Sequence, residues 1–279
     1  MSNAIASAPA SSANLGPGFD CLGLGLELRC RVEAHLADTW VVEELDKAFE
    51  PRPADYVRRV VTDAIGRPAR LVIDNQVPRS RGLGSSAAVM TACAAAALRA
   101  AGEEPTSEQL YELVTAIEGH GDNAGAAVYG GLVAVAGNTL RHLELSPDLA
   151  FVFGVPHERL KTREARHALP AEIPRAAAAR NVARTAFLVE GLRTGDPAAF
   201  AEAGGDEIHE AYRHPLSPIT GQMMAAARAA GALHTAWSGA GPTAIAITTD
   251  PQPVVAALEA ALADRGRVLV LDVAKDGWR

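Results

Sequence analysis

The chain has 279 residues, of which 48% are hydrophobic and 21% are charged, and its formal net charge is -7. This composition is typical of a globular protein with room for one large or two smaller domains. The negative charge argues against nucleic acid as the main partner.

Cysteine usage and the amino terminus indicate the compartment. The three cysteines (Cys21, Cys30 and Cys93) show no CxxC spacing, so a disulfide framework or a structural zinc site is not expected. Residues 1–14 lack the basic and apolar segments of a signal peptide, and no run of about 18 strongly apolar residues appears. We therefore predict a soluble, cytoplasmic protein with no membrane partner.

Hydrophobic spacing and turn residues predict the elements of the first half. Strands are expected at 4–10, 22–37, 69–78 and 126–137, and helices at 53–66, 86–101 and 106–118. Ser85 or Ser86 would cap the alanine-rich second helix, and Gly102 would follow its end. Thr106 with Gln109 would form a capping box on the third.

From about residue 146 the pattern changes. Strands are expected at 149–156, at two short segments around a glycine turn within 233–249, and at 268–274. Helices are expected at 180–195, 197–212, 217–232 and 253–266. The elements mix without a regular βαβ alternation, which favours an α+β fold. We predict two domains, at 1–145 and 146–279.

The stretch PRSRGLGSSAA at 78–88 leads directly into the alanine-rich helix. Gly82 and Gly84 allow backbone conformations that other residues avoid. A helix start offers free N–H groups and partial positive charge, which favour phosphate. The alternative is a capped helix after an ordinary turn. GxxxxGK[ST] is absent, so this is not a Walker A loop.

Glu118 stands near a predicted helix C-terminus, where the helix dipole disfavours a carboxylate. Local rules tend to be broken at functional sites, so Glu118 is a candidate for a specific role. The alternative is an exposed carboxylate at a helix end.

Four clusters together resemble the GHMP small-molecule kinases: PASSANLGPGFD at 9–20, the loop at 78–88, EGHGDN at 118–123 and WSGAGPT at 237–243. The first cluster, which continues as CLGLGL, resembles the homoserine kinase family rather than the mevalonate or galactose kinases. TREARHALP at 162–170, the helix around 187–191 and DEIHEAYR at 206–213 resemble further motifs of that family. The resemblance spans nearly the whole chain.

The resemblance implies a fold, an activity and a nucleotide site. The fold would be an N-terminal ribosomal-S5-domain-2-like, ATP-binding domain and a C-terminal ferredoxin-like domain. The activity would be ATP-dependent phosphorylation of the L-homoserine hydroxyl, in threonine biosynthesis. Ser86 (or Ser85) and Glu118 would hold Mg²⁺, which prefers oxygen ligands. The ATP-binding residues would be Pro78, Arg79, Ser80, Arg81, Gly82, Leu83, Gly84, Ser85, Ser86, Ala87 and Ala88.

The substrate site implied by the resemblance comprises Asn14, Asp20, His120, Asn123, Thr162, Arg166 and Arg213. Asp20 would meet the ammonium of homoserine, and Arg166 and Arg213 its carboxylate and the developing phosphoryl charge. Asn123 stands where mevalonate-type relatives carry an aspartate, so it would orient the hydroxyl without taking its proton. A solvated charge at a helix end is the alternative for Arg213, and a structural imidazole the alternative for His120.

The chain also departs from the family. It is shorter between Ala37 and Asp55, and Gly121 and Ala211 replace prolines of the family motifs. Two other functions stay open: a GHMP kinase for another small alcohol, such as a hydroxy amino acid or pantoate, and a non-catalytic metabolite-binding relative. A homodimer is also left open.

Overall fold

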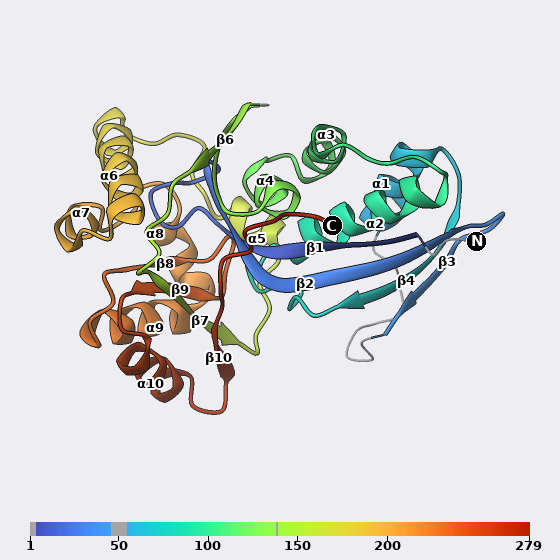
Figure 1. The fold of residues 1–279 in the computed structure, drawn as a ribbon. Helices are drawn as coiled ribbons and strands as arrows, with labels where there is room; N and C mark the ends of the chain where they lie inside the picture. Colours follow the sequence, from blue (N-terminus) through green and yellow to red (C-terminus); the bar gives the residue numbers. More distant parts are fainter. Residues whose placement is uncertain (1–3, 46–54, 138) are drawn as a thin grey trace.

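The computed structural model describes residues 4–45, 55–137 and 139–279, and its elements form two sheets with their helices (Figure 1). The first sheet has strand order β3-β4-β2-β5-β6, and β1 pairs with β2 beside this path. Its strands are β1 (Ala4–Ala13), β2 (Leu22–Leu36), β3 (Val41–Glu44), β4 (Ala69–Asn75), β5 (Leu132–Ala136) and β6 (Thr139–Leu143). Its helices are α1 (Asp55–Ile65), α2 (Ser85–Ala100), α3 (Ser107–Glu118) and α4 (Asp122–Tyr129).

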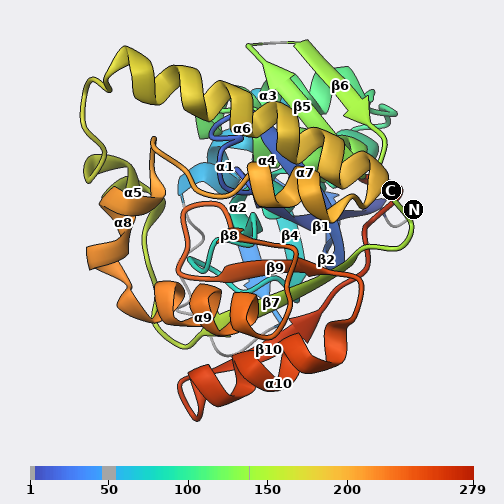
Figure 2. The ribbon, with the colours of Figure 1, turned by 90° about the vertical axis from the view of Figure 1, so that its left-hand side faces the viewer.

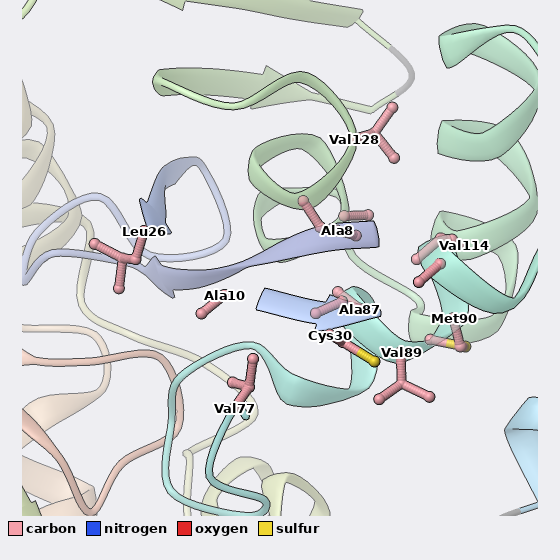
Figure 3. Close-up of a cluster of buried hydrophobic side chains, with 14 of the residues drawn as sticks. Ala8, Ala10, Leu26, Cys30, Val77, Ala87, Val89, Met90, Val114 and Val128 are labelled. Carbon is pink, nitrogen blue, oxygen red and sulfur yellow. The ribbon is translucent and has the colours of Figure 1, made fainter. Parts of the chain in front are cut away.

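Helix α2 explains the alanine-rich stretch. From Ala87 to Leu98 every side chain is buried, because the helix lies between the first sheet and neighbouring helices (Figure 3). A helix buried on all sides reads as apolar all round. Small side chains let it lie close to strands β1 and β2, and Ala8 and Ala10 of β1 belong to the same buried cluster.

The second sheet is antiparallel with order β10-β7-β9-β8. Its strands are β7 (Ala150–Pro156), β8 (His234–Trp237), β9 (Ala244–Thr248) and β10 (Gly266–Val270). The helices of this half are α5 (Thr162–His167), α6 (Arg175–Thr194), α7 (Pro197–Glu202), α8 (Glu210–Arg213), a 3₁₀ turn η1 (His214–Leu216), α9 (Pro218–Ala229) and α10 (Pro251–Leu262).

Alternation along β7 and β9 divides the second core between two faces. Val152 and Ala246 pack with α9 and α10, whereas Phe153 and Ile245 join the large core that includes α6 and the first sheet. Figure 2 shows the same layering, with α6 and α7 above the sheet and α9 and α10 below it. Two sheets with mixed helices and no regular βαβ alternation confirm the α+β prediction.

The end of the chain returns to the first sheet. The backbone groups of Arg279 and Ser7 exchange two hydrogen bonds of 2.9 Å, and the N–H of Ala274 donates to the carbonyl of Gly25. Strand β6 ends and β7 begins on either side of the predicted domain boundary at 145–146. The division into 1–145 and 146–279 stays a prediction, and the returning segment lies against the first domain.

Two predicted elements are wrong in part. Residues 126–137 do not form one strand: 126–129 complete α4, Gly130 and Gly131 turn the chain at φ 72° and 65°, and only β5 is extended. The helix at 197–212 is broken into α7 and α8. Gly205 has φ 89° between them, and the Asp206 carboxylate accepts from the backbone N–H of His209 and Glu210 at the start of α8.

Short elements escaped the sequence patterns, namely β3, β6 and α5, each of four to six residues. The shortened interval between Ala37 and Asp55 includes residues 46–54, which lie outside the described residues. Within the described ranges, every helix is too short or too polar to cross a lipid bilayer.

The end of α2 was predicted correctly. Gly102 has φ 87°, its N–H donates to the carbonyl of Arg99, and the N–H of Glu103 donates to that of Leu98. This pair of bonds is a Schellman motif. At the next helix, the Thr106 hydroxyl accepts from the N–H of Gln109 at 3.1 Å, which is one half of the predicted capping box.

Gly102→Ala should lower the free energy of unfolding by about 1 kcal/mol, because alanine is strained in the left-handed region. A Cβ there would meet nothing within 4 Å, so the effect isolates backbone conformation. Urea denaturation measures it. The control is Glu103→Ala on the neighbouring exposed residue, and equal stability of both variants would contradict the assignment.

Candidate active site

A pocket of about 290 Å³ lies at the start of α2, with walls from both halves of the chain. All seven predicted substrate residues line it: Asn14, Asp20, His120, Asn123, Thr162, Arg166 and Arg213. Ser86, Glu118 and most of the glycine loop line it as well, whereas Arg81 and Ala88 do not. Segments far apart in sequence thus converge on one cavity.

The glycine loop is shaped by close backbone contacts. Gly84 has φ 63°, and a Cβ there would collide with the hydroxyl of Ser11 and crowd the amide oxygen of Asn123. A Cβ on Gly82 would collide with the carbonyl of Ser238. Only glycine fits at these two positions, because the loop is pressed between β1 and the turn that follows β8.

The cap of α2 differs from the prediction. The N-cap is Gly84, without a side-chain capping bond, and not Ser85 or Ser86. The Ser85 hydroxyl is buried and donates to the carbonyl of Val77 at 3.2 Å. Ser85, Ser86 and Ala87 still line the pocket, so the first N–H groups of α2 stand beside it without a capping side chain.

Two loop residues lie away from the pocket. The Arg81 guanidinium donates to the carbonyls of Pro156 at 2.9 Å and His157 at 2.5 Å, which joins the loop to the end of β7. Ala88 is fully buried in the core. Neither side chain is placed to touch a molecule in the cavity.

The turn after β8, which holds residues 238–243 of the WSGAGPT motif, contacts both the glycine loop and β1. The Ser238 hydroxyl donates to the carbonyl of Gly82 at 2.7 Å and lies 2.8 Å from the hydroxyl of Ser12. The N–H of Gly239 donates to the carbonyl of Ala13, and its own carbonyl accepts from the side chain of Asn14. This turn therefore joins the second sheet to the first.

Asn14 and Asp20 lie at the two ends of a strained loop. The backbone φ angles of Asn14, Leu15 and Asp20 are 72°, 54° and 52°, values that residues other than glycine seldom adopt. The Asn14 amide oxygen accepts from the N–H of Asp20 at 3.0 Å, which fixes the two residues relative to each other. Such strain persists only where surrounding contacts enforce it.

Asp20 forms a bidentate ion pair with Arg166, at 2.6 and 3.0 Å. Both side chains are about one-third exposed. Burial lowers the pKa of Arg166, but the hydrogen bonds and charge of Asp20 outweigh it, so this pKa is raised. Asp20, predicted to bind the ammonium of homoserine, and Arg166, predicted to bind its carboxylate, thus contact each other in the pocket wall.

Arg213 is only 2% exposed, so the alternative of a solvated charge at a helix end is wrong. One guanidinium nitrogen donates to the carbonyl of Gly239 at 3.0 Å and lies 3.0 Å from His209 Nδ1, while Nε has no partner. Burial, and then the like charge of Arg166, lower the pKa of Arg213 to about 10, so it stays charged at neutral pH. Among the described residues it has no carboxylate at ion-pair distance.

His120 lies between two acids. Its Nδ1 is 2.8 Å from Asp122, and its Nε2 is 3.6 Å from Glu118. Burial lowers the pKa of His120, but the hydrogen bond and charge of Asp122 outweigh it, and the pKa is raised. Asp122 also accepts from the N–H of Asn123 at 2.7 Å, so this buried carboxylate orders the EGHGDN segment.

Two sets of side chains in the pocket are candidates for binding a metal ion. Asp20, His120 and Asp122 have ligand atoms within 4.8 Å of one another. Asp20 is occupied by Arg166, however, and the other two bond to each other. Ser86 and Glu118 line the same pocket, and their hydroxyl and carboxylate suit a hard cation better than a set that includes an imidazole.

Sequence reasoning missed Asp122 and His209. Both lie inside quoted motifs, EGHGDN and DEIHEAYR, and that was the available signal. Ser11 was also missed: its hydroxyl donates to the Asn123 amide oxygen at 2.8 Å and so fixes the orientation of that side chain.

Known proteins resemble this chain in sequence. Residues 54–131 match the GHMP kinases N terminal domain, and residues 188–267 match the GHMP kinases C terminal domain. The homoserine kinase of Moorella thermoacetica is 38% identical over 272 residues, which cover 92% of each chain. That of Rhodococcus erythropolis is 41% identical and covers 95% of this chain and 92% of its own length.

Solved structures show the same fold. The homoserine kinase of Cytophaga hutchinsonii superposes with a TM-score of 0.87 at 26% identity, over 99% of this chain and 96% of that one. A mevalonate kinase from L. major has a TM-score of 0.74 at 16% identity, which shows the fold alone. The chain therefore belongs to the GHMP kinase family, and within it to the homoserine kinases.

Proposed function

We propose that this protein transfers the γ-phosphoryl group of ATP to the hydroxyl of L-homoserine, giving O-phospho-L-homoserine for threonine biosynthesis. Relatives named homoserine kinase match nearly the whole chain. The observation that carries the choice of acceptor is Arg213, a buried guanidinium that lines the pocket without a carboxylate partner among the described residues. A buried charge of this kind calls for an anion.

The nucleotide phosphates would lie along the glycine loop and the start of α2, whose free N–H groups favour anions. Ser86 and Glu118 would hold Mg²⁺. When bound, this ion would neutralise charge on the phosphate oxygens. Neither Gly82 nor Gly84 leaves room for a side chain, because Gly82 lies against the backbone of Ser238 and Gly84 against the side chains of Ser11 and Asn123.

The acceptor site suits a zwitterion. Arg213, together with Arg166, would bind the carboxylate, and Asp20 would bind the ammonium. Because Asp20 and Arg166 are paired with each other, an amino acid can insert its two charges between them while every charge keeps a partner. Pantoate has no ammonium to offer Asp20, so this arrangement favours an amino acid among the small alcohols.

No general base is required of Asn123. An amide cannot accept the hydroxyl proton, and the loose transition state of phosphoryl transfer needs little base catalysis. Its amide oxygen is bonded by Ser11, so the amide nitrogen is the group directed to orient the hydroxyl. The roles of these residues, the cytoplasmic location and the homodimer stay predictions.

An ADP-coupled assay with ATP, Mg²⁺ and L-homoserine tests the proposal directly. Serine, threonine and pantoate form the comparison panel. Turnover of homoserine well above the panel is expected. Preference for pantoate would identify another GHMP kinase activity, and binding of homoserine without turnover would identify a non-catalytic relative.

Glu118→Gln should raise the activation free energy by roughly 2–4 kcal/mol and lower kcat accordingly, because the amide is a poor Mg²⁺ ligand. The measurement is turnover as a function of Mg²⁺ concentration. Glu112→Gln, on the exposed side of the same helix, is the matched control. If the two variants have equal rates at limiting Mg²⁺, Glu118 is not a metal ligand.

Arg213→Met should raise the KM for homoserine strongly, since a buried charged contact is worth about 3–5 kcal/mol when one partner is removed. Wild type should prefer homoserine to homoserine amide, and the variant should lose that preference. Arg193→Met, an exposed position at the end of α6, is the control. A preserved preference in Arg213→Met would remove this residue from carboxylate recognition.

Asp20→Asn should impair homoserine use by a similar order of magnitude and leave ATP binding nearly intact. The variant removes the carboxylate for the ammonium and also leaves Arg166 without its partner. Calorimetry with ATP and with homoserine separates the two effects. Equal loss of both affinities would mean that Asp20 holds the domains together rather than reading the substrate.

A further inference from the structure

We propose that His209 is a positioning residue that fixes Arg213 and the strained Asn14–Asp20 loop relative to each other. The inference rests on the proposed function, because Arg213 and Asp20 are the groups assigned to the two charges of the acceptor. His209 does not line the pocket, so it would act through its neighbours.

The two ring nitrogens of His209 have opposite roles. Nε2 lies 2.9 Å from the carbonyl of Gly16, and Nδ1 lies 3.0 Å from Nη1 of Arg213. A carbonyl only accepts and a guanidinium only donates. The proton is therefore on Nε2, and Nδ1 accepts from Arg213.

The surroundings keep this ring neutral. His209 is fully buried, and burial lowers its pKa to about 4. The charge of Asp206 raises this pKa and the charge of Arg213 lowers it, so the two partly cancel. A neutral acceptor holds the guanidinium without neutralising it. A carboxylate in the same place would compete with the carboxylate of the substrate, whereas the imidazole leaves the charge of Arg213 available.

The loop that His209 contacts is held from the second half of the chain at three successive carbonyls. His234 Nε2 donates to Leu15, His209 to Gly16, and the side chains of Asn181 and Thr185 both donate to Pro17, at 2.7–2.9 Å. Side-chain donors thus enforce the positive φ angles of this loop. Only His209 among them also contacts Arg213 in the hydrogen bonds of the described residues.

Phe19 completes the connection. Its ring stacks on His209 at 5.1 Å between centroids and 29° between planes. The guanidinium groups of Arg213 and Arg166 lie 5.5 and 5.7 Å from the same ring. Phe19 directly precedes Asp20, so a shift of His209 would be transmitted to both ends of the acceptor site.

Two substitutions separate the two bonds of His209. In His209→Asn the amide oxygen takes the place of Nδ1 and can accept from Arg213, while the bond to Gly16 is lost. In His209→Gln the amide nitrogen takes the place of Nε2 and can donate to Gly16, while the acceptor for Arg213 is lost. Neither variant introduces a charge.

The main readout is the ratio of kcat/KM for homoserine to that for homoserine amide, which reports on carboxylate recognition. The ratio should fall about tenfold or more in His209→Gln, because one charge-assisted hydrogen bond contributes about that factor. It should stay close to the wild-type value in His209→Asn, which keeps the acceptor for Arg213. His209→Gln added to Arg213→Met should not lower it further. The KM for ATP should stay within about twofold throughout.

Other outcomes overturn the inference. If both variants lower the melting temperature and reduce kcat/KM equally for the two substrates, His209 only supports packing. If wild type does not phosphorylate homoserine, the proposed function fails instead, and a second measurement still tests His209. NMR of ¹⁵N-histidine-labelled wild type should show a neutral Nε2–H tautomer from pH 5 to 8, and an Nδ1–H or charged ring would refute the geometry.

Discussion

The turn at Ser238 and Gly239 is the contact on which the rest of the site depends. Its backbone reaches β1 through Ala13, its serine hydroxyl reaches the glycine loop at Gly82, and its Gly239 carbonyl accepts from both Asn14 and Arg213. Three walls of the pocket therefore share one short segment. A side chain at position 82 would separate them, because backbone from the two halves meets there without a gap.

Charge in the pocket is distributed unevenly, and the unevenness suits its proposed ligands. Asp20 and Arg166 neutralise each other at the partly exposed wall. Arg213, deeper in the protein, is contacted by a neutral imidazole and a carbonyl. Arg213 thus keeps its positive charge without a carboxylate at ion-pair distance among the described residues, and the glycine loop adds the positive end of α2. Arg213 would suit the carboxylate of the proposed acceptor, and the start of α2 would suit the phosphates of the proposed nucleotide.

Much of the fold could be predicted from sequence, because local physics governs it. Gly102 ends α2 through backbone conformation alone, and the four glycine-marked clusters have the order of a known family. The N-cap of α2 could not be predicted. Ser85 is the better capping residue by propensity, but α2 begins after Gly84, which is in the left-handed region and has no room for a Cβ beside Ser11 and Asn123.

The site was predictable as a set of residues and unpredictable as a network. The seven predicted substrate residues line one pocket, yet the pairing of Asp20 with Arg166 arises from segments 146 positions apart. His209 carried no signal of its own, since a lone histidine in a helix-like stretch has no characteristic spacing. The break between α7 and α8 was missed although the sequence contains a local signal for it, namely Gly204 and Gly205 followed by the capping carboxylate of Asp206.

The small side chains of α2 have a consequence for how this protein can adapt to what it binds. A helix with every side chain buried from Ala87 to Leu98 is held firmly in place, because densely packed interiors resist compression. In the proposed nucleotide site, its first N–H groups would therefore be oriented before the nucleotide binds, with little reorganisation free energy spent on them. The wall of the pocket that α5 contributes is packed less densely than α2. There the six-residue helix α5 carries Thr162 and Arg166 on a surface that is only partly buried.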